Sequence, residues 1–264
     1  MKKVIGTIIL IIAIICFGWS AFSLGKYAWQ TWTTQKNLDN LADKVNNDTI
    51  SIPDTDKESG ESEDPVSESE AMMEKYGELY KENKDFIGWL SVEGTKINYP
   101  VMYTPNDPEY YLRKNFDGDY DIGGMLFVDA RCTFNPTSTD TILYGHHMNN
   151  GTMFGPLMDF QDNDYLKKHT TITFDTMYRP GTYKIFASFQ SKAYDPDSEE
   201  FKYYDFINAE TSYDFEEYLN NIKNLSLYYD EENAPSFGDE IITLSTCDYY
   251  TTDGRFAVLA KRIK

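Results

Sequence analysis

Residues 241–264 read IITLSTCDYYTTDGRFAVLAKRIK, two β-type runs joined by a loop rich in turn-forming residues. In the first run Thr243, Ser245 and Cys247 fall on one face of the expected strand, and apolar residues alternate with them on the other. The second run begins at Arg255. If the two runs pair antiparallel, Cys247 and Arg255 lie at the same end of the ladder, close enough to act on one substrate carbonyl.

The polar neighbours of Cys247 indicate a face that lines a groove and not the core. Upstream, TILYGHHM at 141–148 places His146 at the end of another β-type run. A thiol, an imidazole and a guanidinium at strand ends supply a nucleophile, a proton-transfer partner and a cation for the oxyanion in acyl transfer through a thioester. Taken singly, Cys247 could equally be a small buried apolar residue, and Arg255 an ordinary surface arginine.

Two adjacent histidines compete for the role of the imidazole. On a strand, His146 and His147 point to opposite faces, so one of them at most can address the thiol, and periodicity does not choose between them. A metal site would need a further ligand, for which His169 is available, but the chain has none of the usual zinc-ligand spacings. We therefore expect no metal and no other cofactor.

The acidic composition excludes one class of partner. The chain has 264 residues and a formal net charge of −19, whereas nucleic-acid binding needs concentrated lysine and arginine. Its cysteines, Cys16, Cys132 and Cys247, are too few and too scattered for a disulfide framework or a zinc cluster. We expect no nucleic-acid partner and a free thiol at position 247.

An uncharged N-terminal segment predicts a membrane anchor over residues 1–26. Residues 4–24 carry no charge, and as a helix this run is long enough to span a hydrocarbon core of about 30 Å. A cleaved signal peptide is the alternative, but the apolar run is longer than usual and lacks a clear cleavage site. Lys2 and Lys3 precede the run, so the positive-inside rule predicts a single-pass protein of the cell membrane with its N-terminus in the cytoplasm.

The remaining chain divides into a stalk and a folded domain that would lie outside the membrane. Residues 27–71 are poor in large apolar side chains and rich in acids, which predicts a flexible, self-repelling stalk. The domain over 72–264 is expected to open with a helix, in which Met73, Tyr76 and Leu79 recur at helical spacing.

The rest of the domain is predicted to be mostly β. The β-type runs are 96–102, 124–129, 141–147, 170–175, 183–191, 240–247 and 255–263. A helix that begins with a capping box at Thr211 and Asp214 precedes the last two runs. Many strands without regular βαβ alternation indicate a mostly antiparallel barrel or sandwich.

These motifs together resemble a known enzyme family. TLSTC followed eight positions later by arginine, with YGHHMNNGTMF upstream, is similar to the motifs of the sortases, the membrane-anchored cysteine transpeptidases of Gram-positive bacteria. The stretch GWLSVEGTKINYPV at 88–101 and the helix before the last two strands are similar to the class B branch. The resemblance covers about residues 75–264. It implies a closed eight-stranded β-barrel with its site in a groove at the strand ends.

The resemblance also implies roles for individual residues. The nucleophile would be Cys247, the histidine would be the one directly after Gly145, which is His146, and the arginine would be Arg255. The substrate-binding positions that it implies are Asn98, Met102, Tyr144, Ser245 and Asp248. Further specificity residues are expected in the loop 192–207.

By the same resemblance, the chain would cleave a C-terminal sorting signal of secreted surface proteins after Thr. It would then transfer the acyl group to an amine of a peptidoglycan precursor or a pilin. Two other functions remain open on the residues alone. One is a secreted cysteine protease that hydrolyses without transfer, and the other is a membrane-tethered binding module in which Cys247 is structural.

Overall fold

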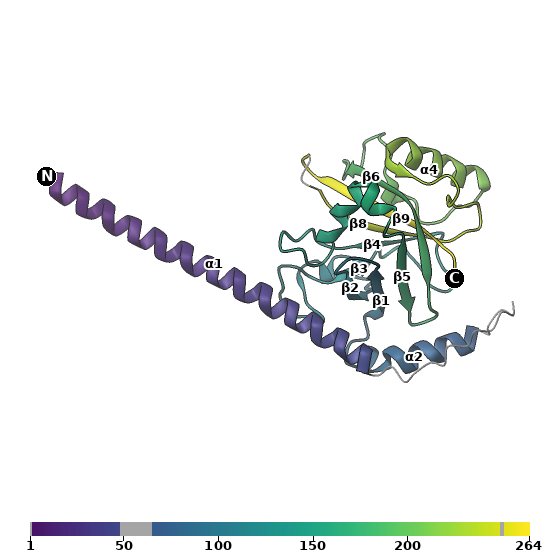
Figure 1. Ribbon diagram of the computed structural model, residues 1–264, viewed down its shortest axis with the longest axis horizontal. Coiled ribbons are helices and arrows are strands. Elements are labelled where there is room, and N and C mark those ends of the chain that lie inside the picture. The colour runs from purple at the N-terminus through teal and green to yellow at the C-terminus, as the bar shows by residue number, and fades with distance from the viewer. Residues whose placement is uncertain (1, 48–64, 249–250) are drawn as a thin grey trace. The chain divides into compact units, whose positions relative to one another are not determined.

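The computed structural model describes residues 2–47, 65–248 and 251–264, in two compact units, Met1–Asn40 and Leu41–Lys264. The helices are α1 (Lys2–Asn47), α2 (Pro65–Glu82), α3 (Asn163–Leu166) and α4 (Ser212–Leu225), with 3-10 turns η1 (Tyr110–Arg113), η2 (Gly155–Gln161) and η3 (Tyr203–Asp205). The strands are β1 (Phe86–Val92), β2 (Asn98–Met102), β3 (Leu126–Val128), β4 (Asp140–Tyr144), β5 (Thr171–Thr176), β6 (Thr182–Lys192), β7 (Ser226–Tyr229), β8 (Ile241–Cys247) and β9 (Gly254–Arg262). Figure 1 shows their arrangement.

Eight of these strands close a mixed barrel in the part of the chain that the structure describes. The order is β5-β1-β2-β3-β4-β8-β9-β6, and β6 closes the ring by pairing with β5, while β7 adds to the outside edge of β6. The pairings β2–β3 and β4–β8 are parallel and the others are antiparallel. The predicted closed eight-stranded β-barrel is therefore confirmed, and closure leaves few strand edges exposed.

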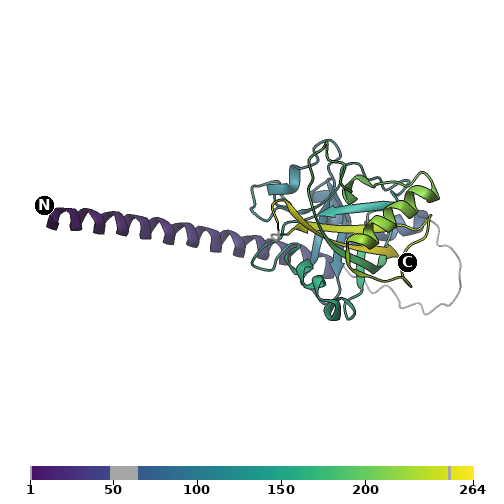
Figure 2. The ribbon, with the colours of Figure 1, turned by 90° about the horizontal axis from the view of Figure 1, so that it is seen from above.

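The helix α4 covers the outer face of the barrel beside β6, β8 and β9, as two views show (Figure 1, Figure 2). Its first turn carries the predicted capping box, because Thr211 and Asp214 exchange hydrogen bonds. Buried aromatic and aliphatic side chains fill the layer between α4 and the sheet; they are Phe186, Phe189, Tyr203, Phe215, Tyr218, Ile222, Ile241 and Leu259. The outer face of the C-terminal strands is thus part of a second core.

This cover corrects one prediction about the polar face of β8. Thr243 is fully buried and does not line a groove, and Ser245 is 2% exposed, so the predicted groove face begins only at Ser245. The hydroxyl of Thr243 donates to Asp140, and the hydroxyl of Ser245 shares a 2.6 Å hydrogen bond with Tyr203. These polar residues face the covering layer because they bond to it, and the face becomes accessible again at Cys247.

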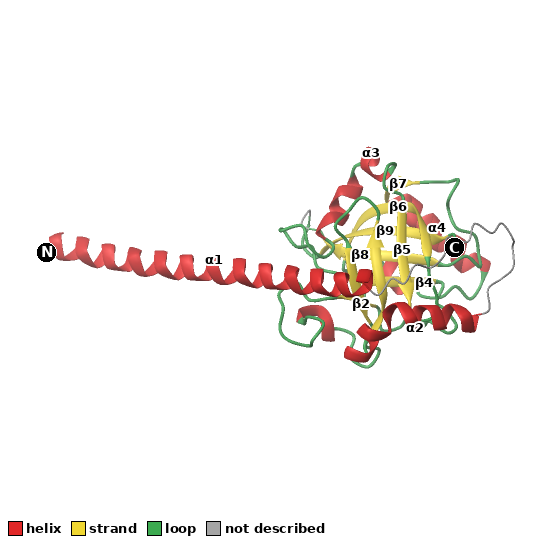
Figure 3. Cartoon of the chain, turned by 60° about the horizontal axis from the view of Figure 1, so that its bottom comes forward, coloured by secondary structure: helices red, strands yellow, loops and turns green. Residues whose placement is uncertain are grey.

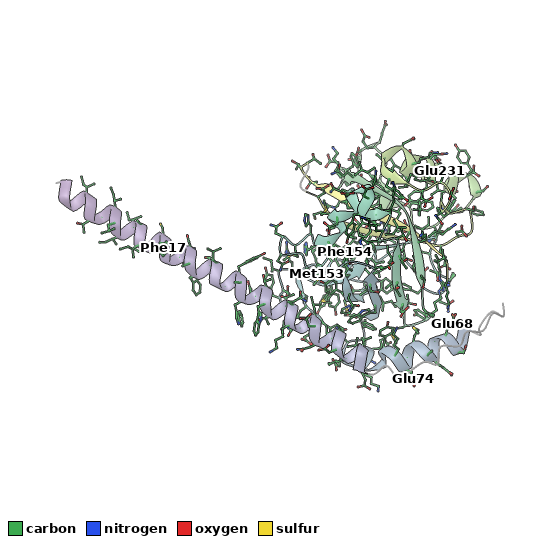
Figure 4. The ribbon with its side chains drawn as sticks, viewed as in Figure 1. Phe17, Glu68, Glu74, Met153, Phe154 and Glu231 are labelled. Carbon is green, nitrogen blue, oxygen red and sulfur yellow. The ribbon has the colours of Figure 1, made fainter. Side chains whose placement is uncertain are left out.

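The helix α1 extends beyond the predicted anchor. Among the described residues, α1 is the one helix that is long and apolar enough to cross a membrane. Its apolar side chains are exposed, as Figure 4 shows for Phe17, which is 76% exposed. Residues 26–47 contain no glycine or proline, so nothing in the sequence ends the helix there.

The stalk predicted over 27–71 is therefore helical at both of its ends. One end belongs to α1, and the other lies in α2, which begins at Pro65. Residues 48–64, which include most of the acidic run, lie outside the described residues. The division into anchor, stalk and catalytic domain stays a prediction.

The lead-in helix of the domain buries Tyr76 and Leu79 as predicted, but Met72 and not Met73 completes the buried face. Met72, Tyr76 and Leu79 are buried, whereas Met73 is 46% exposed. The spacing i, i+4, i+7 is the usual buried stripe of an amphipathic helix. The ring of Tyr76 in α2 packs against the rings of Phe86 and Trp89 in β1. Figure 3 shows α2 outside the yellow strands.

The predicted β-type runs correspond to β2, β3, β4, β5, β6, β8 and β9. Sequence reasoning missed β1, because nearly all of its residues are buried and no alternation of period two is visible. It also missed the short strand β7, which follows α4 directly. The run 141–147 was expected to remain a strand through His147, but β4 ends at Tyr144. A Cβ at Gly145 would lie 2.5 Å from a methyl carbon of Leu126 and 2.7 Å from the ring of Phe154, so a side chain there would have to displace both.

Asp140 is a fully buried carboxyl at the start of β4. One carboxyl oxygen accepts hydrogen bonds from Thr243 Oγ1 (2.8 Å) and Tyr218 Oη (3.0 Å), and the other has no partner among the described residues. Burial, with a smaller contribution from the nearby carboxylate of Asp129, raises the pKa of Asp140 to about 7. The Asp140 carboxyl therefore binds a proton more tightly in the folded protein than in the unfolded chain.

We expect this group to make stability depend on pH. Because the folded pKa lies above the unfolded one, the stabilisation is fully present below about pH 4 and is lost as pH rises through about 7. The Asp140→Asn variant of residues 41–264 should lack this dependence. In urea unfolding, the wild type should lose about 2–3 kcal/mol between pH 5 and pH 8 relative to the variant. Parallel pH profiles would contradict the assignment.

Candidate active site

A cavity of about 440 Å³ opens at the ends of β4 and β8. Its lining includes Cys247, His146 and Arg255, which the sequence singled out. The remaining lining residues are Pro108, Glu109, Leu112, Phe127, Asp129, Ala130, Arg131, Tyr144, Gly145, Ser245 and Thr246. The three reactive side chains therefore meet in one cavity, although they come from three segments of the chain.

Cys247 and Arg255 are directly opposed residues of the β8–β9 ladder, as predicted. Opposed residues share a face and their Cβ atoms lie about 5 Å apart. The Arg255 guanidinium donates through Nη1 to the carbonyls of Asp253 (3.2 Å) and Gly254 (2.9 Å). Its partners in the described residues are thus neutral carbonyls and not a carboxylate, so its charge stays available to a substrate.

Close backbone approach shapes the loop between these two residues. The amide of Asp248 donates to the carbonyl of Gly254 (2.9 Å), which continues the ladder one step past Cys247. A Cβ at Gly254 would lie 2.2 Å from the carbonyl oxygen of Asp248, so a side chain there would push the strands apart. This glycine keeps Arg255 in register with Cys247.

His146 reaches the cavity because β4 and β8 are parallel. Tyr144 is the register partner of Ser245, so the residue two positions beyond each, His146 and Cys247, leaves the sheet at the same end. His146 Nε2 donates to the carbonyl of Leu112 (2.8 Å), since a carbonyl can only accept. Burial lowers the pKa of His146 below its usual value, so the ring is neutral at pH 7 and its lone pair lies on Nδ1.

His147 has a different place. It lies beyond the end of β4, so the expected alternation of the two histidines across a strand does not apply. Its Nδ1 lies 3.2 Å from the carbonyl oxygen of Cys247, and it forms an isolated bridge with Met153. His147 is not among the residues that line the cavity. Sequence reasoning missed this contact, by which His147 holds the main chain of Cys247.

The turn after the histidines is anchored in the barrel. Met153 and Phe154 lie side by side there and are fully buried (Figure 4). The amide of Phe154 donates to the carbonyl of His146 (3.0 Å). The main chain of His146 is therefore fixed from one side by this turn, while its ring is fixed from the other by Leu112.

The predicted substrate-binding residues divide into two groups. Tyr144 and Ser245 line the cavity. The other three do not: Asp248 is buried and accepts from Gln190 Nε2 (2.8 Å), Asn98 accepts from Trp89 Nε1 (2.7 Å), and Met102 has no exposed surface. Asn98 is exposed outside the cavity, whereas Met102 offers no surface to a substrate.

Sequence reasoning also missed Asp129 and Arg131, which follow β3 and line the cavity. Arg131 Nε and Nη2 donate to the two oxygens of Asp129 at 2.9 and 2.8 Å, and Tyr144 Oη donates to the same carboxylate at 3.0 Å. Burial alone would raise the pKa of Asp129, but these bonds hold it below its usual value. The spacing Asp-x-Arg after a short β-type run is the signal that could have revealed the pair.

The predicted specificity loop, 192–207, contributes to the site from behind. None of its described residues is among those that line the cavity. Tyr203 from this loop contacts Ser245 through the 2.6 Å hydrogen bond, and the carbonyl of Tyr204 accepts from Arg131 Nη2. The loop therefore supports two lining residues.

Comparison with known proteins identifies the family of the chain. The sortase domain family matches residues 90–263. Sortase B of Staphylococcus aureus is 32% identical over 197 residues, which are 74% of this chain and 77% of that protein. The chain belongs to the sortase family. Sortase B of Listeria monocytogenes is 36% identical to this sortase over 171 residues, 65% of this chain and 66% of that relative.

Solved structures of sortases share the fold. A Staphylococcus aureus sortase B–substrate complex matches with a TM-score of 0.71 and 28% identity, over 89% of this chain and 98% of that one. A sortase B complexed with triglycine matches with a TM-score of 0.71 and 27% identity, over 89% and 99%. A mutant Clostridium perfringens sortase B has a TM-score of 0.69 and 26% identity, over 87% and 98%. This sortase is a homologue of sortase B, a cysteine transpeptidase.

The two histidines should respond differently to replacement. His146→Ala removes a ring that lines the cavity, and we expect kcat/KM on a cleaved peptide to fall roughly 100-fold or more. His147→Ala removes one hydrogen bond to the main chain of Cys247, so the loss should stay below about tenfold. Steady-state kinetics of both variants on one peptide provides the measurement. A larger loss for His147→Ala would show that the roles are reversed.

Proposed function

We propose that this sortase cleaves a C-terminal sorting signal of secreted surface proteins after Thr and transfers the acyl group to an amine. The observation that carries the proposal is the meeting of Cys247, His146 and Arg255 in one cavity of a sortase fold. Cys247 is the nucleophile, His146 moves the proton, and Arg255 hydrogen-bonds the oxyanion and the substrate backbone.

The neutral His146 ring determines the order of proton transfers. Cys247 Sγ attacks the carbonyl carbon of the Thr, while the thiol proton passes to Nδ1 of His146. The imidazolium then gives this proton to the departing amine as the C–N bond breaks, which leaves a thioester on Cys247. In the second half an acceptor amine attacks the thioester, gives a proton to His146 and forms an amide. His146 then returns the proton to the departing sulfur, so atoms and charges balance over the cycle.

The acceptor in this proposal is an amine of a peptidoglycan precursor or a pilin. The relative complexed with triglycine supports an amine that ends a short glycine chain. The cavity is lined by Cys247, so the donor peptide and then the acceptor amine would reach the same thiol through it. A hydrolase would use the same residues, and the two reactions differ in whether water or the amine attacks the thioester.

The proposed location follows from α1. We propose that its apolar part anchors the chain in the cell membrane as a single span, and by the positive-inside rule Lys2 and Lys3 support an N-terminus in the cytoplasm. The catalytic unit would then face outward, where surface proteins emerge from the membrane. A cysteine-labelling experiment on intact cells can test this orientation with a reagent that does not cross the membrane.

Partition of the product tests the proposed reaction. A library of Thr-containing peptides first identifies a cleaved sequence for the full chain in detergent. Added triglycine should then divert the acyl product from free acid to amide, in proportion to its concentration, because it competes with water for the thioester. Cys247→Ala should form neither product. Product that stays acid at every triglycine concentration would indicate a protease, and turnover by Cys247→Ala would exclude the thioester mechanism.

A further inference from the structure

Asp129 and Arg131 form a closed ion pair at the wall of the cavity. Asp129 is 9% exposed, and its carboxylate accepts four hydrogen bonds. Three come from the amide, Nε and Nη2 of Arg131, at 3.0, 2.9 and 2.8 Å, and the fourth comes from Tyr144 Oη at 3.0 Å. A buried carboxylate with all its lone pairs satisfied holds its partners in one geometry.

The guanidinium of Arg131 also reaches the opposite connection. Nη2 donates to the carbonyl of Tyr204 in η3 at 2.5 Å, and Nη1 lies 3.6 Å from the carboxylate of Asp205. The side chain of Asp205 is 60% exposed, so its contact is worth little, whereas the carbonyl belongs to the fixed main chain. Arg131 thus ties the β3–β4 connection to the β6–α4 connection.

Both ends of this tie support residues that line the cavity. At one end Asp129 accepts a hydrogen bond from Tyr144. Tyr144 lies one residue before Gly145 and two residues before His146. At the other end Tyr203, next to Tyr204, shares its hydroxyl hydrogen bond with Ser245, two residues before Cys247. The pair therefore fixes the relative place of Tyr144 and η3 without touching the thiol.

We propose that Arg131 and Asp129 are positioning residues that set substrate specificity, an inference that rests on the proposed function for its peptide substrate. They hold Tyr144, which lines the cavity, against the η3 connection behind it, so that Tyr144 forms a rigid wall for the peptide segment before the scissile Thr. Arg131 acts through Asp129 and the carbonyl of Tyr204, and not as a ligand of the peptide. If the ion pair is broken, Tyr144 is no longer held in one position. The peptide substrate then binds more weakly, while the reactivity of Cys247 is unchanged.

The experiment compares Arg131→Lys, Asp129→Asn and the double variant in the full chain. Lysine keeps the charge but cannot form the two-armed fork, and Asn keeps the shape but loses the charge. For a cleaved peptide, we expect KM to rise roughly tenfold in each single variant and no further in the double variant, because both changes break one unit. The value of kcat and the rate of Cys247 alkylation should stay within about twofold. Discrimination against a peptide with one altered residue before the Thr should decrease.

A matched control comes from another arginine–carboxylate pair. Arg179 donates to Glu240 at 2.6 Å, and neither residue lines the cavity. Arg179→Lys alters a single guanidinium–carboxylate hydrogen bond away from the cavity and should leave KM and discrimination unchanged. Thermal unfolding of every variant sets an assay temperature at which all are folded.

Four results would overturn the assignment. Additive effects of the two changes would show that Arg131 acts on the peptide independently of Asp129. An unchanged KM in Arg131→Lys would show that the contacts of Arg131 do not shape the cavity. A parallel fall in kcat and in the rate of Cys247 alkylation would show that the pair supports the fold as a whole. Loss of the fold in both variants would show the same. Failure of the proposed function is a separate outcome, since it would appear in the unaltered protein as the absence of an acyl–Cys247 species.

Discussion

The antiparallel pairing of β8 with β9 is the interaction on which the rest of the site depends. It joins the C-terminal strands into the closed barrel and brings Cys247 opposite Arg255. The register is strict, because a shift of one residue would turn every side chain to the other face. At Gly254 the two main chains approach so closely that a Cβ would overlap the carbonyl of Asp248, which fixes the register at the reactive end.

Parallel pairing and the outer cover complete the arrangement. Since β4 runs parallel to β8, their carboxyl ends coincide, and His146 emerges beside Cys247 from a segment about a hundred residues earlier in the chain. The layer of η3 and α4 buries the outer face of β8 as far as Ser245 and stops there. The thiol is accessible because it lies one step beyond this cover. The His146 ring is itself partly buried, and this burial lowers its pKa and keeps the ring neutral at pH 7.

The sequence predicted the strands that alternate and the residues that lie at their ends. Cys247 and Arg255 could be paired from a short hairpin, because a local loop leaves few alternative registers. The choice of His146 over His147 rested on resemblance, since alternation could not decide and β4 in fact ends before both. The strand β1 was missed because it is buried on both faces and carries no periodic signal.

Contacts between distant segments were beyond sequence reasoning. The ion pair of Asp129 with Arg131 is local, but the role proposed for it depends on the carbonyl of Tyr204, which lies 73 positions away. A main-chain acceptor leaves no trace in residue identity. The burial of Met102 was missed for a similar reason, because whether a strand residue faces the barrel interior or a groove depends on what covers it.

The rate at which a sorting peptide acylates Cys247, followed by intact mass in Arg255→Lys and in the unaltered protein, tests the central claim most directly. Lysine keeps the charge beside the thiol but loses the planar fork that can bind an oxyanion and a peptide carbonyl together. If the β8–β9 register places Arg255 on the oxyanion, the variant should be slower by an amount equal to about 2–3 kcal/mol of transition-state stabilisation. Equal acylation rates would contradict this account and leave Arg255 as a background charge.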